Sequence, residues 1–172
     1  DKERKKQVLP VAYCYNEAKK QHAWRLKGFS DAGNKPIYGL ERLVKDPFKP
    51  VLIVEGEKTA DAAQKILPDH VVISWMGGAQ AINKVNWRHL EKREVVIWPD
   101  NDQAGIDAAG GIKERIDCIN RHKGLISVVD TAKLGLPKKW DLADEVPQGL
   151  NAEQTIESAR KDKANNEKTA HE

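Results

Sequence analysis

Apolar and polar positions along the chain follow one pattern before residue 50 and another after it. Residues 11–15 alternate between apolar and small or polar side chains, and the polar stretch at residues 16–21 follows them. This alternation, which resumes at residue 23, predicts a β-hairpin over residues 11–28. A short helix is expected at residues 40–45, because a proline two residues later cannot continue it.

From residue 51 onward, short apolar runs rich in β-branched residues alternate with segments of helical spacing. Runs of this kind are typical of strands buried on both faces. The order β-α-β-α-β-α-β predicts an α/β fold in which helices flank a parallel sheet of about four strands. The expected strands are residues 51–54, 70–74, 94–98 and 125–129, and the expected helices are residues 57–67, 79–90, 102–121 and 151–160.

We therefore expect three parts along the chain. Residues 1–48 form a small N-terminal β-rich extension with basic residues, and residues 49–150 form the α/β domain. Residues 151–172 form a C-terminal helix and a flexible tail.

Composition adds few constraints to this picture. The net charge of +3, from 29 basic and 26 acidic residues, permits a nucleic-acid partner without requiring one. No apolar run reaches the roughly 18 residues of a membrane helix, and the charged residues 1–6 are not expected to form a signal peptide. Two cysteines far apart in sequence are expected to stay reduced in a cytoplasmic protein. The first residue is not methionine, so we expect a piece of a longer protein.

Acidic residues follow two of the predicted strands. Glu55 comes directly after the first strand, and Asp100 and Asp102 follow the third. If these strands are neighbours, the three carboxylates meet at one edge of the sheet, where they repel one another. A hard cation such as Mg²⁺ or Mn²⁺ relieves that repulsion and suits phosphoryl transfer. Gly56 and Gly105 allow a tight turn or a close backbone approach beside them.

A simpler role is open to two of these acids. Asp100 and Asp102 precede a predicted helix, and aspartate is a common helix cap. One carboxylate suffices for capping, however, so a pair spaced by one residue favours metal binding.

The stretches VEGEKTAD at residues 54–61 and WPDNDQAG at residues 98–105 resemble the signatures of the Toprim domain. This domain occurs in topoisomerases, DnaG-type primases, OLD-family nucleases and RecR-type repair proteins. The wording of both stretches, together with Trp140-Asp141-Leu-Ala-Asp144, is most similar to primases of phages and plasmids. The resemblance implies a Toprim, Rossmann-like fold over residues 49–150.

The resemblance also implies roles for individual residues. Glu55 would act as general base or metal ligand, and Asp100 and Asp102 would bind Mg²⁺ or Mn²⁺. DnaG-type primases often carry another aspartate four residues after the glutamate, but Thr59 stands there and Asp61 follows two residues later. Asp141 and Asp144 are candidates for the outer acids. Four basic residues are candidates for contacts with nucleotide or DNA: Arg25, Lys27, Lys35 and Lys58.

The function implied is the catalytic core of a DNA primase of phage or plasmid type. Its partners would be a single-stranded DNA template, nucleoside triphosphates and a replicative helicase in the same or a partner chain. Two alternatives stay open. One is a metal-dependent nuclease of the OLD kind, and the other is a non-catalytic Toprim module that binds DNA or a protein partner.

Overall fold

The computed structural model describes residues 11–26, 35–120 and 125–169. Contacts within the chain divide it into two compact units, Asp1–Asp31 and Ala32–Glu172.

The smaller unit is a two-stranded antiparallel hairpin, as predicted. Strand β1 (Val11–Asn16) pairs with β2 (Gln21–Leu26) along its whole length. The side chain of Asn16 accepts a hydrogen bond of 3.0 Å from the backbone amide of Lys19, which closes the polar turn between the strands.

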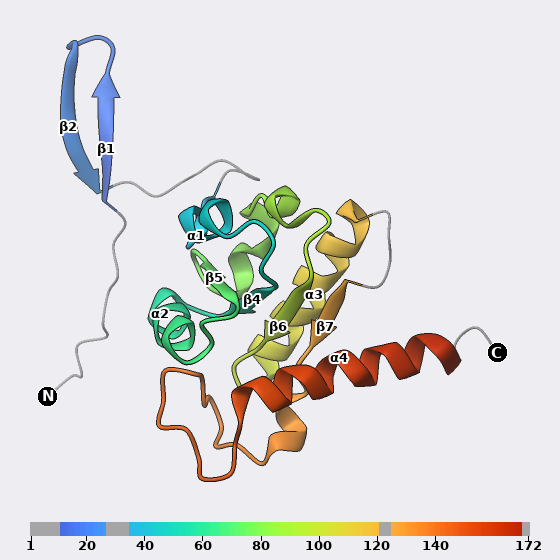
Figure 1. The fold of residues 1–172 in the computed structure, drawn as a ribbon. Helices are drawn as coiled ribbons and strands as arrows, with labels where there is room; N and C mark the ends of the chain where they lie inside the picture. The colour runs from blue at the N-terminus through green and yellow to red at the C-terminus, as the bar shows by residue number, and fades with distance from the viewer. Residues whose placement is uncertain (1–10, 27–34, 121–124, 170–172) are drawn as a thin grey trace, which may run out of the picture. The chain divides into compact units, whose positions relative to one another are not determined.

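A five-stranded sheet in the order β3-β5-β4-β6-β7 forms the centre of the larger unit (Figure 1). Four of its strands run parallel, which confirms the predicted α/β fold. The fifth, β3, pairs antiparallel with β5 and is too short to give a sequence pattern. The strands are β3 (Ile37–Tyr38), β4 (Val51–Val54), β5 (Val71–Trp75), β6 (Val95–Trp98) and β7 (Ile126–Val128).

Helices cover both faces of this sheet (Figure 1). One core lies between the sheet and α1, η1, η2 and α3, and a second core lies between the sheet and α2 and α4. The central strand β4 divides its side chains between the two, with Val51 and Ile53 in the first and Leu52 and Val54 in the second. The helices are α1 (Leu40–Lys45), α2 (Glu57–Ile66), η1 (Ala79–Lys84), η2 (Trp87–Leu90), α3 (Gln103–Ile119), η3 (Thr131–Leu134) and α4 (Ala152–Thr169).

The single helix predicted for residues 79–90 is wrong. Two 3-10 helices, η1 and η2, occupy this segment, and Val85 between them is extended and forms a parallel bridge to Lys35. The side chain of Asn86 accepts a hydrogen bond from the backbone amide of Arg88 and so starts η2. The apolar spacing was nevertheless informative, because Val85 and Leu90 are buried.

The ends of the larger unit differ in detail from the expected boundaries. Both β3 and α1 precede residue 49, yet they pack with the larger unit because β3 pairs with β5. At the other end, α4 continues to Thr169, well past the helix expected at residues 151–160. Glu157 pairs with Arg160 and Lys161 at helical spacing and supports that extension. Within the described ranges, no helix is long and apolar enough to cross a membrane.

Candidate active site

The carboxyl ends of β4 and β6 bring two of the predicted acids to the same edge of the sheet. These strands are parallel neighbours, and Val54 lies opposite Trp98 in their register. Glu55 follows Val54 directly, and Asp100 lies two residues beyond Trp98. Both side chains are partly buried.

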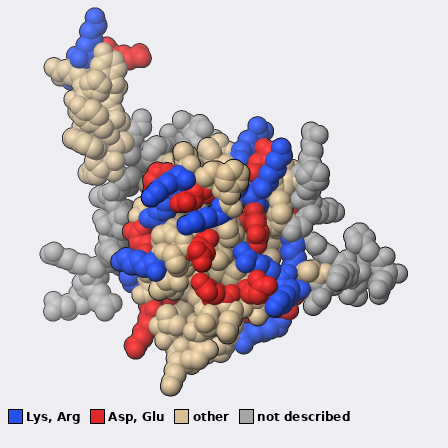
Figure 2. Space-filling view, viewed as in Figure 1, with Lys and Arg blue, Asp and Glu red and all other residues tan. Residues whose placement is uncertain are grey.

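Asp100 lies at the centre of a group of carboxylates. Its pKa is raised to about 7, first because burial disfavours the charged form and then because neighbouring negative charges do the same. Those charges belong to all four other acids that the sequence singled out: Glu55, Asp141, Asp102 and Asp144. We call these five residues the acid cluster. In Figure 2, acidic side chains gather in a band near the middle of the visible face, with Lys and Arg around it.

Asn101 ties the segment that carries two of these acids to the end of β6. Its side-chain amide donates hydrogen bonds to the carbonyl oxygens of Leu136, at 2.7 Å, and Pro137, at 3.0 Å. Its backbone amide donates to the carbonyl of Trp140 at 3.2 Å. These bonds attach the segment that precedes Asp141 to the residue that follows Asp100. Sequence reasoning missed Asn101, although its place between two acids was a signal.

Asp102 caps helix α3, as the simpler reading of the sequence allowed. Its Oδ1 accepts a hydrogen bond of 2.9 Å from the backbone amide of Gly105. A Cβ on Gly105 would lie 2.7 Å from the carbonyl oxygen of Asp100, so only glycine permits this close approach. Asp102 therefore caps α3 and also lies close to Asp100.

The donor set of the acid cluster suits a hard divalent cation, because every side chain in it offers carboxylate oxygens. Among the residues that the structure describes, no three such side chains already lie together as a formed metal site. Some of the oxygens bond to nearby backbone, since Asp141 accepts from the amide of Ala143 and Asp144 accepts from the amide of Asp141. A cation bound by Asp141 or Asp144 would compete with these bonds for the carboxylate oxygens.

The predicted basic residues are distributed over both units. The Nζ of Lys35 lies beside Gly77, 2.6 Å from where a Cβ would stand, and the neighbouring Gly78 borders Glu55. Lys58 is exposed near the start of α2. Arg25 lies in the hairpin, and Lys27 falls outside the described residues.

Asp61 serves a structural contact. Its two oxygens accept hydrogen bonds from Tyr38, at 2.8 Å, and from Arg42. These bonds lower the pKa of Asp61, with the Arg42 bond as the larger cause. The guanidinium also lies over the Tyr38 ring and donates to the carbonyl of Val72. Asp61 thus links α2 to α1 and β3.

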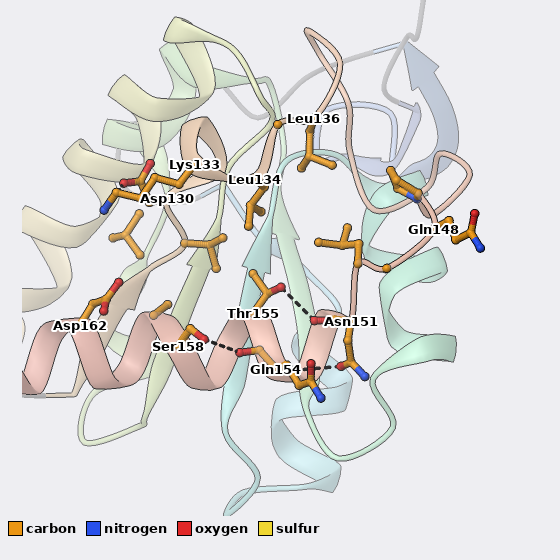
Figure 3. Close-up of a pocket in the computed structure, with 17 residues that line it drawn as sticks. Asp130, Lys133, Leu134, Leu136, Gln148, Asn151, Gln154, Thr155, Ser158 and Asp162 are labelled. Atoms are coloured by element: carbon orange, nitrogen blue, oxygen red, sulfur yellow. Dashed lines mark hydrogen bonds and ion pairs between the residues drawn. The ribbon is translucent and has the colours of Figure 1, made fainter.

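A cavity of about 620 Å³ opens between α4 and the segment after β7 (Figure 3). Its wall includes Leu136, which Asn101 anchors. Asn151, Gln154 and Thr155 line it from α4 and the residue before it. Asn151 accepts hydrogen bonds from the backbone amide of Gln154 and the hydroxyl of Thr155, which cap that helix. No member of the acid cluster lines this cavity.

Comparison with known proteins gives a family. A family model described as a domain of unknown function, DUF6371, matches residues 1–101, more than half of the chain. The chain belongs to the DUF6371 family. The matched span of this DUF6371 chain contains Glu55 and Asp100, and the other three acids follow it. No curated protein matches the chain.

Among solved structures, this DUF6371 chain is similar to the catalytic core of DnaG. The TM-score is 0.50 and the sequence identity is 23%, over 72% of this chain and 39% of the DnaG chain. At this identity the likeness shows the fold, a Toprim-like α/β fold. The chain spans 39% of the length of the DnaG chain that it matches.

Proposed function

We propose that the chain is the Toprim part of a primase-like nucleotidyltransferase that joins nucleotides on single-stranded DNA. The observation that carries the proposal is the half-buried Asp100, with four further carboxylates close enough to raise its pKa. Repulsion between carboxylates does not stabilise a fold, whereas a site for divalent cations needs carboxylates that lie close together. The DnaG-like fold supports the proposal at the level of architecture.

Mg²⁺ or Mn²⁺ would be held by Asp100 and Asp102, with Glu55, Asp141 and Asp144 as the remaining oxygen donors. Such a cation, when bound, neutralises charge on the phosphates of an incoming nucleotide.

Side chains of the chain itself would do the rest. Glu55, next to the Gly78 turn, would accept the proton of the attacking 3′-hydroxyl if it does not serve as a metal ligand. Lys35 and Lys58 would contact phosphates, and Arg25 and Lys27 the template. We also propose that the parent protein serves a phage or plasmid and acts with a replicative helicase.

Label incorporation from nucleoside triphosphates on unprimed single-stranded DNA tests the proposal. The wild type should make product with Mg²⁺ or Mn²⁺, and Asp100→Asn should reduce it by about two orders of magnitude or more. Asp102→Asn should do the same, and because asparagine also caps helices, α3 stays intact in that variant. Asp107→Asn, an exposed acid on the same helix, is the matched control and should stay within about twofold of the wild type.

Other outcomes distinguish the alternatives. Undiminished synthesis by Asp100→Asn would overturn the assigned site, and no synthesis by the wild type would overturn the primase proposal for this chain. Metal-dependent nicking of a plasmid that is lost in Glu55→Gln would favour the nuclease. Absence of divalent-cation binding in a calorimetric titration would favour the non-catalytic module.

A further inference from the structure

One face of the β1–β2 hairpin is made almost entirely of apolar and aromatic side chains. Residues that face each other across an antiparallel pair share a face, and alternate pairs along it do so too. Three such pairs fall on this face, which we call the aromatic face. It comprises Val11 and Leu26, Tyr13 and Trp24, and Tyr15 and His22.

This face is exposed in the hairpin. Trp24 retains 69% of its accessible surface and Tyr13 retains 60%. The other four tryptophans of the chain retain 2–4% and lie in the cores of the larger unit: Trp75, Trp87, Trp98 and Trp140. A contiguous exposed apolar patch of this kind marks an interaction surface.

The rings of the aromatic face are already arranged in a row. Tyr13 stacks on His22 with centroids 5.2 Å apart and planes at 11°. Trp24 flanks Tyr13 at 5.1 Å, and Tyr15 flanks His22 at 4.7 Å. The row therefore offers several ring surfaces along the hairpin without further ordering of side chains.

Charge identifies the kind of partner. Residues 1–31 contain eight Lys and Arg and four Asp and Glu, a net charge of +4, whereas the whole chain carries +3. The positive charge of the protein thus lies in the hairpin unit. Within the hairpin, Lys19 and Lys20 lie in the turn, and Arg25 lies on the face of β2 opposite the aromatic face, where it pairs with Ala12. In Figure 2 most of the visible surface of the hairpin is uncharged, and charged side chains lie at its end.

We propose that the aromatic face binds single-stranded nucleic acid by stacking bases on Tyr13 and Trp24, while Lys19 and Lys20 in the adjoining turn contact phosphates. Stacking on aromatic rings next to positive charge is how proteins bind single strands without sequence preference. The identity of the strand as a primase template rests on the proposed function. The binding itself does not depend on the acid cluster.

Intrinsic fluorescence tests this directly, because Trp24 is the exposed tryptophan. In the free chain, acrylamide should quench Trp24 emission, which is obtained as the difference between the wild type and Trp24→Phe. Adding an oligo(dT) strand should quench that emission and protect the remainder from acrylamide. An acrylamide-resistant Trp24 in the free chain would mean that another part of the chain, or a second copy, covers the face, and would overturn the proposal.

Affinity for a labelled oligo(dT), measured by anisotropy, separates stacking from simple apolar contact. Trp24→Leu keeps an apolar side chain but loses the ring, and it should weaken binding at least fivefold. Trp24→Phe keeps a ring and should stay within about twofold of the wild type. A protein partner would tolerate leucine better, so equal affinity of Trp24→Leu and the wild type would contradict base stacking.

Two further readouts make the result unambiguous. Lys19→Gln with Lys20→Gln should lower the salt dependence of binding, whereas Trp24→Leu should leave it unchanged. Asp107→Asn, which changes an exposed acid of α3 outside the acid cluster, should bind oligo(dT) like the wild type. A chain that binds the strand through Trp24 but makes no primer would support this proposal and refute the proposed function. A chain that makes primer but does not bind the strand through Trp24 would refute this proposal and support the proposed function.

Discussion

The side-chain amide of Asn101 donates a hydrogen bond of 2.7 Å to the carbonyl oxygen of Leu136. It joins the end of β6 to a segment 35 residues later in the chain. Through this bond and its neighbours, Asp141 and Asp144 come close enough to raise the pKa of Asp100. The composition of the acid cluster thus depends on a residue that carries no charge.

Asn101→Ala should therefore loosen the acid cluster. Loss of the two side-chain bonds, one part-buried and one exposed, should cost about 1 kcal/mol of unfolding free energy. Affinity for Mn²⁺ should fall roughly tenfold, because residues that orient metal ligands commonly matter to that extent. Urea denaturation and calorimetric titration measure the two effects. Gln103→Ala, which removes an exposed bond to Asp107, is the control and should change neither. Unchanged affinity in Asn101→Ala would refute the positioning role.

Two of the three glycines of α3, Gly105 and Gly110, should respond in opposite directions to alanine. A Cβ at Gly105 meets the backbone of Asp100 at 2.7 Å, so Gly105→Ala should destabilise the fold by about 1–3 kcal/mol. A Cβ at Gly110 meets nothing within 4 Å, and Gly110→Ala should stabilise by about 0.5–1 kcal/mol through helix propensity. Urea denaturation of both variants checks this. Equal effects would show that α3 does not approach Asp100 closely.

Asp100 should make stability fall as the pH rises. Its pKa is about 7 in the folded chain and 3.8 without the fold. Between those values the folded chain keeps a proton that the unfolded chain has lost, so the free energy of unfolding decreases from about pH 4 to pH 7. In EDTA, Asp100→Asn should remove this decrease and be about 1–2 kcal/mol more stable than the wild type at pH 7.5, a figure reduced for partial exposure. Parallel pH profiles of the two proteins would disprove the coupling.

Titration of His70 should make the stability of the fold decrease as the pH falls. It is buried, and its Nε2 lies 3.3 Å from the Arg160 guanidinium. Burial, followed by the charge of Arg160, lowers its pKa below the ordinary 6.5, although the negative charges of Glu94, Glu153 and Asp69 oppose this. The unfolded chain takes up a proton below pH 6.5 that the folded chain resists, so stability is lost as the pH falls from there.

Denaturation at pH 7.5 and at pH 5.5 tests the role of His70. The wild type should lose more stability than His70→Gln between these two values, because glutamine does not titrate. Asp100 acts in the other direction over this range, so the comparison should be repeated in the Asp100→Asn background. If His70→Gln and its parent lose stability equally in both backgrounds, His70 is not held neutral by its site.

The sequence by itself determined the strands and the position of the acids. Runs such as Val51–Val54 are apolar at every position because both faces of a parallel strand are buried, and this leaves a signal that does not depend on distant residues. Parallel strands end at one edge, so Glu55 and Asp100 had to lie near each other once their strands were neighbours. The hairpin could also be predicted from the sequence, because alternation and a polar turn are local features.

Only the tertiary structure decided the remainder. The segment at residues 79–90 has helical spacing, but a bridge from Lys35 to Val85 divides it, and no local pattern reveals a partner fifty residues away. Strand β3 forms because β5 offers it a free edge. Asp141 and Asp144 join the acid cluster through Asn101, whereas Asp61 is held by Tyr38 and Arg42. Charges of the same kind differ in their surroundings because long-range contacts place them, and sequence spacing does not record those contacts.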